Sequence, residues 1–174
     1  MAKKASIKKE EKALSQFEDA ALEAGVEHVA GKGAIEAGYR SRITLQEGCS
    51  FTASIDIDTH FNKLEPNSPR WDYGLGVKLR NGVEVALWVE PHPASSTGEV
   101  KKMLSKLDWL KEKLETKDLR SMRALRDAAV AQKIKPYRWQ VSLDGAIRIT
   151  PKSNEARLLA LKGLEVPSRH IKLP

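Results

Sequence analysis

Two alternating apolar runs on either side of an Asn-Gly pair constrain this chain more than any other feature. Residues 71–79 read WDYGLGVKL, residues 83–90 read VEVALWVE, and Asn81-Gly82 lies between them. An Asn-Gly pair in this position favours a tight hairpin turn, because both residues tolerate positive φ. On the second run, one face would carry Val83, Val85, Leu87 and Val89, and the other Glu84, Ala86, Trp88 and Glu90. The sequence therefore predicts an antiparallel hairpin over residues 71–90.

Further strands and helices are predicted on both sides of this hairpin. Alternation predicts strands over residues 42–46, 51–61, 137–142 and 146–150, the last two joined by a second hairpin turn, LDGA. Helical spacing predicts helices over residues 7–25, 98–115, 118–133 and 153–163. Ser96 and Glu99 have the spacing of a capping box, and residues 26–41 have the composition of a loop. This order predicts an α+β fold with a central, mainly antiparallel or mixed sheet flanked by helices.

Length and composition fit one domain over residues 1–174. A chain with 41% hydrophobic and 30% charged residues can bury a hydrophobic core, and the basic residues 1–6 are expected to be flexible. No apolar run reaches the roughly 18 residues of a membrane span, and no apolar signal segment is present. Cys49 is the one cysteine, which excludes an internal disulfide, so a cytoplasmic location is expected.

Carboxylates are expected at the open end of the first hairpin. With a two-residue turn, residue i pairs with residue 163 − i, so Asp72 would lie opposite position 91 and beside Glu90. Such neighbouring carboxylates suit Mg²⁺ or Mn²⁺, and Asp58 at the end of its predicted strand could be a third ligand. Each acid also has a plainer interpretation. Asp72 could pair with Arg70, Glu90 could be a solvated strand end, and Asp56 and Asp58 could face solvent.

His92 follows Glu90 by two positions. It would share the face of Glu90 if the chain stays extended, and histidine suits proton transfer near neutral pH. Pro91 and Pro93 flank it, so a packed loop position is the alternative.

Basic residues concentrate on the two predicted helices after this cluster. One side of the helix over residues 98–115 would carry Lys102, Lys106, Trp109 and Lys113. The next helix adds Arg120, Arg123 and Arg126, and residues 117–138 contain seven basic and two acidic residues. Such cations beside an exposed tryptophan suit a phosphate backbone with a base or sugar on the ring, and the net charge of +7 also fits DNA or RNA. The alternative is a solvated helix face with Trp109 covered by another element.

Missing motifs exclude several classes of enzyme. The sequence contains no GxGxxG, GxxxxGK[ST], CxxC or GxSxG, and its four histidines lack the spacing of a metal motif. Nothing therefore indicates a nucleotide cofactor, a cysteine-rich zinc site or a serine triad.

The predicted order of helix, three antiparallel strands, helix and strand resembles the core of the PD-(D/E)XK nuclease-like superfamily, which has the restriction-endonuclease-like fold. The resemblance covers roughly residues 7–142, and its short motif lies in WDYG and VEPH. Asp72 and Glu90 match the two acids, Trp71 replaces the proline before the first acid, and His92 replaces the lysine after the second. Some members take this lysine from a neighbouring helix, where this chain has Lys106.

The resemblance implies a nucleic-acid-binding domain that, if active, hydrolyses phosphodiesters with Mg²⁺ or Mn²⁺ held by Asp72, Glu90 and Asp58. His92 or Lys106 would then orient or deprotonate the attacking water, and the basic helices would hold the nucleic acid backbone. Two alternatives stay open. One is a non-catalytic module on the same fold that binds nucleic acid or an acidic protein, and the other is a protein that pairs with a partner or with itself through residues 98–133.

Overall fold

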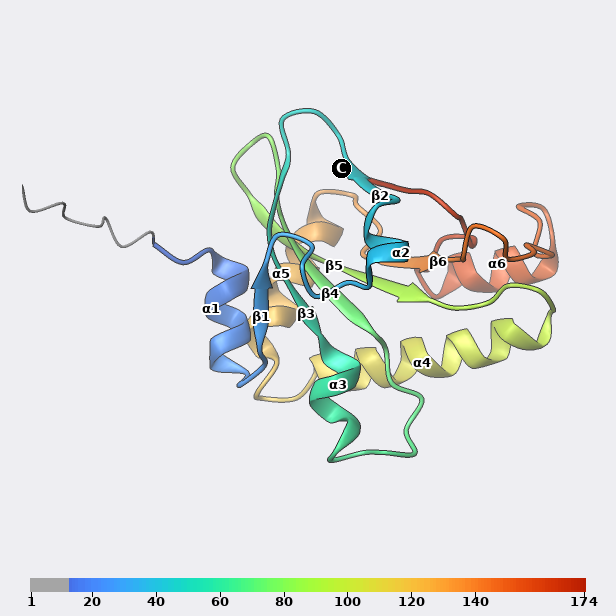
Figure 1. The fold of residues 1–174 in the computed structure, drawn as a ribbon, viewed down its shortest axis with the longest axis horizontal. Helices are drawn as coiled ribbons and strands as arrows, with labels where there is room; N and C mark the ends of the chain where they lie inside the picture. Colours follow the sequence, from blue (N-terminus) through green and yellow to red (C-terminus); the bar gives the residue numbers. More distant parts are fainter. Residues whose placement is uncertain (1–12) are drawn as a thin grey trace, which may run out of the picture.

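A twisted five-stranded sheet forms the centre of the computed structural model, which describes residues 13–174 (Figure 1). In spatial order its strands are β1 (His28–Ala30), β3 (Ser50–Asp56), β4 (Tyr73–Lys78), β5 (Glu84–Pro91) and β6 (Tyr137–Gln140). Neighbours are antiparallel from β1 to β5, whereas β5 and β6 are parallel. A parallel pair needs a crossover, which α4 (Gly98–Leu114) and α5 (Arg120–Ala131) provide. The fold is therefore α+β, with a mixed sheet flanked by helices, as the sequence predicts.

Two hydrophobic cores cover the two faces of the sheet. On the face that carries Ile55, Trp88 and Trp139, the core includes residues of α1 (Gln16–Glu23), α4, α5 and α6 (Asn154–Leu161). The opposite face carries Leu75 and Leu87 and packs near α2 (Ala37–Arg40) and a small parallel sheet of β2 (Ile43–Leu45) and β7 (Ile171–Leu173). Among residues 13–174, no helix is long and apolar enough to cross a membrane.

Glycines on β4 let bulky side chains approach the sheet backbone. Gly74 lies opposite Trp88 in the ladder between β4 and β5. A Cβ atom on Gly76 would lie 2.3 Å from Thr52 Oγ1 and 2.6 Å from Phe17 Cβ. In the GLGV stretch, Leu75 and Val77 therefore face one core. Gly74 and Gly76 leave space for Trp88 and Phe17 in the other core.

The sheet also anchors the beginning of α1. Ser15 and Glu18 form a capping box, and the buried Glu84 carboxylate accepts hydrogen bonds from the backbone N–H groups of Gln16 and Phe17. These bonds satisfy N–H groups that have no partner within the helix. The helix predicted over residues 7–25 corresponds to α1, and residues 7–12, with the predicted flexible residues 1–6, lie outside the described residues.

The strand predicted over residues 51–61 is wrong beyond Asp56, because α3 (Ile57–Asn62) begins there. The Asp56 carboxylate accepts hydrogen bonds from Thr59 N at 2.8 Å and Thr59 Oγ1 at 2.9 Å. This N-cap competes with continuation of the strand ladder. Asp58 therefore lies in the first turn of a helix and not on a strand face.

The first hairpin has a three-residue loop in place of the predicted two-residue turn. Leu79 N donates to Val83 O at 2.8 Å, and Gly82 adopts a φ of 86°. Residue i therefore pairs with residue 162 − i, as in the pair of Tyr73 and Val89. Continued by one residue, this register places Asp72 opposite Glu90 itself and not opposite position 91.

The second predicted hairpin, around LDGA, is wrong. β6 ends at Gln140, and the predicted strand over residues 146–150 contributes only an isolated bridge from Ile147 to Ala94. A later segment occupies the free edge of β6, since Val141 N donates to Ser168 O at 2.9 Å. Residues 26–41, predicted as a loop, contain β1 and α2.

Gly76→Ala should destabilise the protein by about 1–3 kcal/mol, because the added methyl group would overlap Phe17 and Thr52. Gly38→Ala is the matched control, since a Cβ atom at Gly38 in α2 would meet nothing within 4 Å. Urea denaturation measures both changes. Equal unfolding free energies for the two variants would contradict the close approach of α1 to β4.

Candidate functional site

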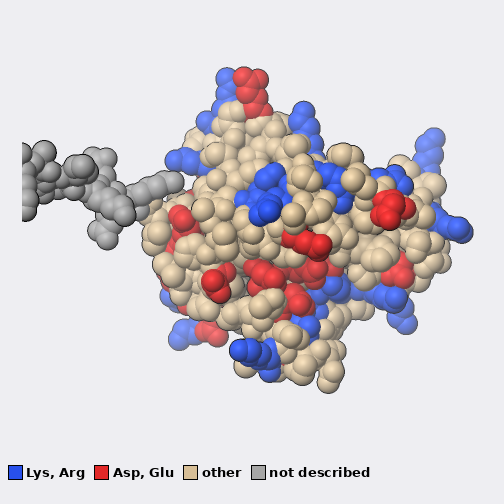
Figure 2. Space-filling view, viewed as in Figure 1, with Lys and Arg blue, Asp and Glu red and all other residues tan. Residues whose placement is uncertain are grey.

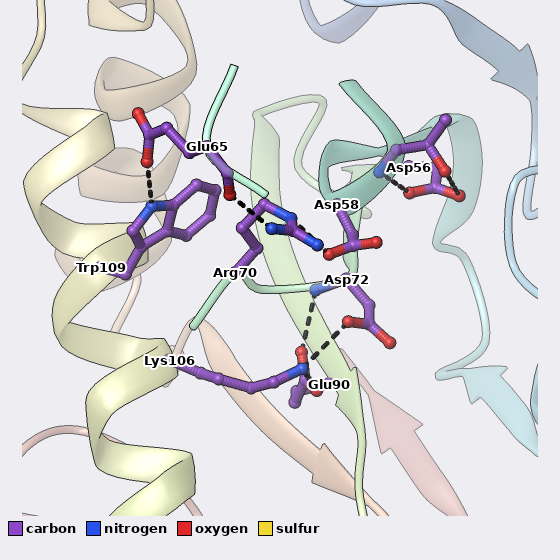
Figure 3. A network of polar contacts seen from close by, with 9 residues as sticks. Asp56, Asp58, Glu65, Arg70, Asp72, Glu90, Lys106 and Trp109 are labelled. Carbon is purple, nitrogen blue, oxygen red and sulfur yellow. Dashed lines mark hydrogen bonds and ion pairs between the residues drawn. The ribbon is translucent and has the colours of Figure 1, made fainter. Parts of the chain in front are cut away.

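Asp72, Glu90 and Lys106 meet at the ends of β4 and β5 (Figure 3). Lys106 Nζ lies 3.2 Å from Asp72 Oδ1 and also contacts Glu90 Oε1. In addition, Asp72 N donates a hydrogen bond to Glu90 Oε2 at 2.8 Å. Because one ammonium nitrogen contacts both carboxylates, their oxygens lie within the roughly 8 Å that a shared metal ion allows.

Local structure brings these side chains together from three elements. Glu90 lies on the same face of β5 as Trp88, toward the helices, and its side chain is 0% exposed. On α4, the buried Met103, Leu107 and Leu110 pack on the sheet. Because these apolar residues face the sheet, the neighbouring position 106 on the helix faces Glu90. The predicted meeting of Asp72 with Glu90 is thus present, and Lys106 joins them from the helix.

Burial dominates the electrostatics of this cluster. Burial raises the pKa of Glu90 well above its ordinary value, and the nearby Asp72 charge raises it further, against the opposing effect of Lys106. Burial also raises the pKa of Asp72. Burial lowers the pKa of Lys106, but the attraction of Glu90 and Asp72 outweighs it, so the pKa of this ammonium is raised overall. The carboxylate pair therefore favours a cation beside it.

Asp58 lies beside Asp72 but has another partner. The first turn of α3 binds the backbone at Asp72, since Ile57 N donates to Asp72 O at 2.9 Å. Arg70 Nε donates to Asp58 Oδ1 at 2.8 Å. Within residues 13–174, no group of three or more His, Cys, Asp or Glu side chains could hold a metal ion. The prediction of Asp58 as a third metal ligand is therefore corrected, because Arg70 engages its carboxylate.

His92 stands next to Glu90 and is held in place by Glu99. Its Nε2 lies 2.8 Å from Glu99 Oε2, and its Nδ1 lies 4.0 Å from Glu90 Oε1. The backbone is fixed as well, because His92 N donates to Gln140 O and Trp139 Nε1 donates to His92 O. Burial lowers the pKa of His92, against the opposing effect of Glu99. His92 shares the face of Glu90 as predicted, without direct contact.

The capping box predicted from Ser96 and Glu99 is wrong. Thr97 is the N-cap residue of α4, and no side chain caps this end of the helix. The Glu99 carboxylate instead contacts His92 and, at 3.1 Å, Lys102 Nζ.

The predicted basic face of α4 exists, but acids neutralise it. Lys102 contacts Glu99, Lys106 contacts Asp72 and Glu90, and Lys113 contacts Glu65. On α5, Arg123 and Arg126 both contact Glu115, whereas Arg120 is exposed. These cations are therefore mostly engaged within the protein.

The expectation of an exposed Trp109 is wrong. Its side chain is buried, and its Nε1 donates to Glu65 Oε2 at 2.8 Å. Phe61 contacts the ring edge-on, with 5.4 Å between centroids. The loop between α3 and β4 thus covers Trp109, as the alternative interpretation of the sequence holds, and base stacking on this ring is excluded in this conformation.

Acidic side chains gather in the middle of the face shown in Figure 2, with Lys and Arg side chains around them. Some of these charges affect the pKa of Tyr73. Burial raises the pKa of Tyr73 to about 12, and the charges of Asp56, Asp72 and Glu36 add to the effect. The surroundings of Tyr73 are therefore electronegative, in contrast to the net positive charge of the whole chain.

Comparison of the chain with protein-family models, curated proteins and solved structures gave no match. Its function is therefore inferred from its own residues.

Three residues near the site have roles that the sequence did not reveal. Arg70 and Glu65 stand in the Pro- and Asn-rich stretch EPNSPR, whose composition predicts only a loop. From the sequence alone, Glu99 could equally belong to a capping box or be the partner of His92. Their contacts depend on how the loop folds back on α4, for which spacing along the chain carries no signal.

Glu90→Gln should make stability less sensitive to rising pH. The folded pKa of Glu90 lies above its unfolded value, so its stabilising contribution is full below about pH 4.3 and is lost as the pH rises through the folded pKa. The difference in unfolding free energy should therefore shift in favour of the variant as the pH rises from about 4.3 through the folded pKa, by about 1.4 kcal/mol per unit of pKa difference.

Urea denaturation at several pH values, without divalent metal ions, measures this shift. Glu112→Gln is the matched control, because it removes an exposed carboxylate from α4. A pH-independent difference between Glu90→Gln and the wild type would contradict the raised pKa.

Proposed function

We propose that this chain is a metal-dependent, nuclease-like domain that binds DNA or RNA and hydrolyses its phosphodiester backbone. The observation that carries the proposal is the convergence of Asp72, Glu90 and Lys106 on one site. Two acids on neighbouring strands and a nearby lysine are the groups that the resemblance to the PD-(D/E)XK superfamily implies.

The order of elements supports this proposal. α1, then β3, β4 and β5 as an antiparallel meander, then the helices α4 and α5, and then β6 parallel to β5 follow the order of that family's core. A restriction-endonuclease-like arrangement of the sheet and helices is accordingly part of the proposal.

Asp72 and Glu90 fit the binding of Mg²⁺ or Mn²⁺. Mg²⁺ in such enzymes is held by one or two carboxylates together with substrate phosphates, so two protein ligands suffice. The buried Glu90 and the partly exposed Asp72 offer oxygen atoms to one cation, a position that the Lys106 ammonium now approaches. When bound, the metal ion would lower the pKa of a water molecule and offset the charge of the phosphate.

We assign the role of the family's lysine to Lys106. Its Nζ is held by both carboxylates, and its side chain is 19% exposed, so it can donate a hydrogen bond to a water molecule or a phosphate oxygen at the mouth of the site. His92 stands at the motif position but is held by Glu99. Its Nδ1 lies 4.0 Å from Glu90 Oε1, beside that carboxylate but beyond hydrogen-bond distance.

A non-catalytic binding module is the second candidate, and one observation favours it. Lys106 contacts both carboxylates directly, and an ion pair with a fully buried Glu90 can serve the fold alone. The two candidates differ in their response to divalent metal ions.

Lys106→Gln and Glu90→Gln should each lower the rate of nucleic acid cleavage in Mg²⁺ by about 10²-fold or more, because both residues lie at the reacting centre. Cleavage of labelled DNA and RNA under single-turnover conditions measures the rates. Arg157→Gln is the matched control, since it removes an exposed arginine from α6, outside the predicted basic helices, and its rate should stay within about twofold of the wild type. Equal rates for all three variants would point to a contaminating nuclease.

Mg²⁺ or Mn²⁺ should raise the melting temperature of the wild type and change its tryptophan fluorescence, because Trp71 and Trp88 flank the proposed ligands. Both effects should disappear in Glu90→Gln and persist in Glu112→Gln. A wild-type protein that ignores both ions would exclude the catalytic proposal and leave the binding module.

A further inference from the structure

Arg70 and Asp58 form a second charged pair beside Asp72. Arg70 Nε donates to Asp58 Oδ1 at 2.8 Å, and Arg70 Nη1 donates to Glu65 O at 2.5 Å. In Figure 3 this pair lies next to Asp72, on the side away from Lys106. Asp72 therefore lies between the Lys106 ammonium and the Arg70–Asp58 ion pair.

One nitrogen of the Arg70 guanidinium is left without a hydrogen-bond partner among residues 13–174. This nitrogen is Nη2, the second terminal nitrogen, and it is not fully buried. The side chain as a whole is only 12% exposed. Arg70 therefore keeps one donor group unpaired while most of its side chain is enclosed.

Glu65 connects Arg70 to α4. Glu65, whose carbonyl accepts from Arg70, has a carboxylate that accepts from Trp109 Nε1 and contacts Lys113. Asp58 holds the other side of the guanidinium from the first turn of α3. A guanidinium fixed on two sides loses little conformational freedom when it binds a phosphate.

The charges of the site favour an anion once a metal ion is present. Asp58, Asp72 and Glu90 carry three negative charges when ionised, and Arg70 and Lys106 carry two positive charges, which leaves a net charge of −1. A divalent cation changes this to +1, and one phosphodiester group then makes the site neutral. Without Arg70, the metal-loaded site would already be neutral and would attract a phosphate less.

We propose that Arg70 contacts the substrate by binding a phosphate group of the nucleic acid strand beside Asp72, and that Asp58 and Glu65 position Arg70. This inference rests on the proposed function and adds to it a specific phosphate-binding residue. Asp58 accordingly acts through Arg70 and not as a metal ligand.

The test is the salt dependence of nucleic acid binding, measured by fluorescence anisotropy with a short labelled DNA duplex in Ca²⁺, which takes the same kinds of oxygen ligands as Mg²⁺. Arg70→Gln should weaken binding by about tenfold or more and should reduce the slope of log K against log salt by about 0.9, the value for one lost phosphate contact. Arg157→Gln is the matched control, because it removes an exposed arginine from α6, away from α3 and the site (Figure 1). Its affinity and slope should match those of the wild type.

Arg70→Lys separates charge from geometry, and its melting temperature shows that the fold is retained. It should keep the wild-type slope but bind more weakly, because an ammonium lacks the planar fork that Asp58 and Glu65 hold. Wild-type affinity in both Arg70 variants would overturn the role of Arg70 while leaving the proposed function intact. A wild-type protein without salt-dependent binding would overturn the proposed function, and the phosphate-binding role of Arg70 with it.

Discussion

The contact of the Lys106 ammonium with two carboxylates is the interaction on which the rest of the structure depends. Burying Glu90 without a cation would cost several kcal/mol, and Lys106 offsets that cost while it ties α4 to the β4–β5 hairpin. The position of α4 in turn fixes Trp109 and Lys113, which hold the loop that carries Arg70. A single charged cluster therefore couples the helical layer, the sheet and the loop beside Asp72.

The same cluster is compatible with both candidate functions, the metal-dependent nuclease-like domain and the non-catalytic binding module. A buried acid pair with a lysine can stabilise a fold, and it can also hold a divalent cation at the place where a phosphate is cleaved. The surplus of carboxylates over cations at the site, with Asp58, Asp72 and Glu90 against Arg70 and Lys106, fits the second use better, because a stabilising ion pair needs no such surplus. The proposed role of Arg70 follows from that surplus.

The sequence predicted the central features of the fold and the main residues of the site, and it failed where contacts depend on loops. Alternation and the Asn-Gly pair predicted the hairpin, and the resemblance to the PD-(D/E)XK superfamily pointed to Lys106 on the following helix. The turn length could not be read from the Asn-Gly pair alone, because Gly82 at positive φ fits both a two- and a three-residue loop. The burial of Trp109 and the pairing of Asp58 depend on residues 63–70, whose composition predicts a loop without predicting its path.

The pairing of β2 with β7 has a consequence for the order in which the fold can be completed. Ile43 and Ile171 lie side by side in a parallel pair and belong to the second core, although most of the chain separates them. The face of the sheet opposite α4 thus remains partly uncovered until residues 171–173 have been synthesised, while the hairpin and α4 can already pack. Closing so long a loop is entropically costly and slow. The pairing of β2 with β7 is therefore expected to be a late step in folding.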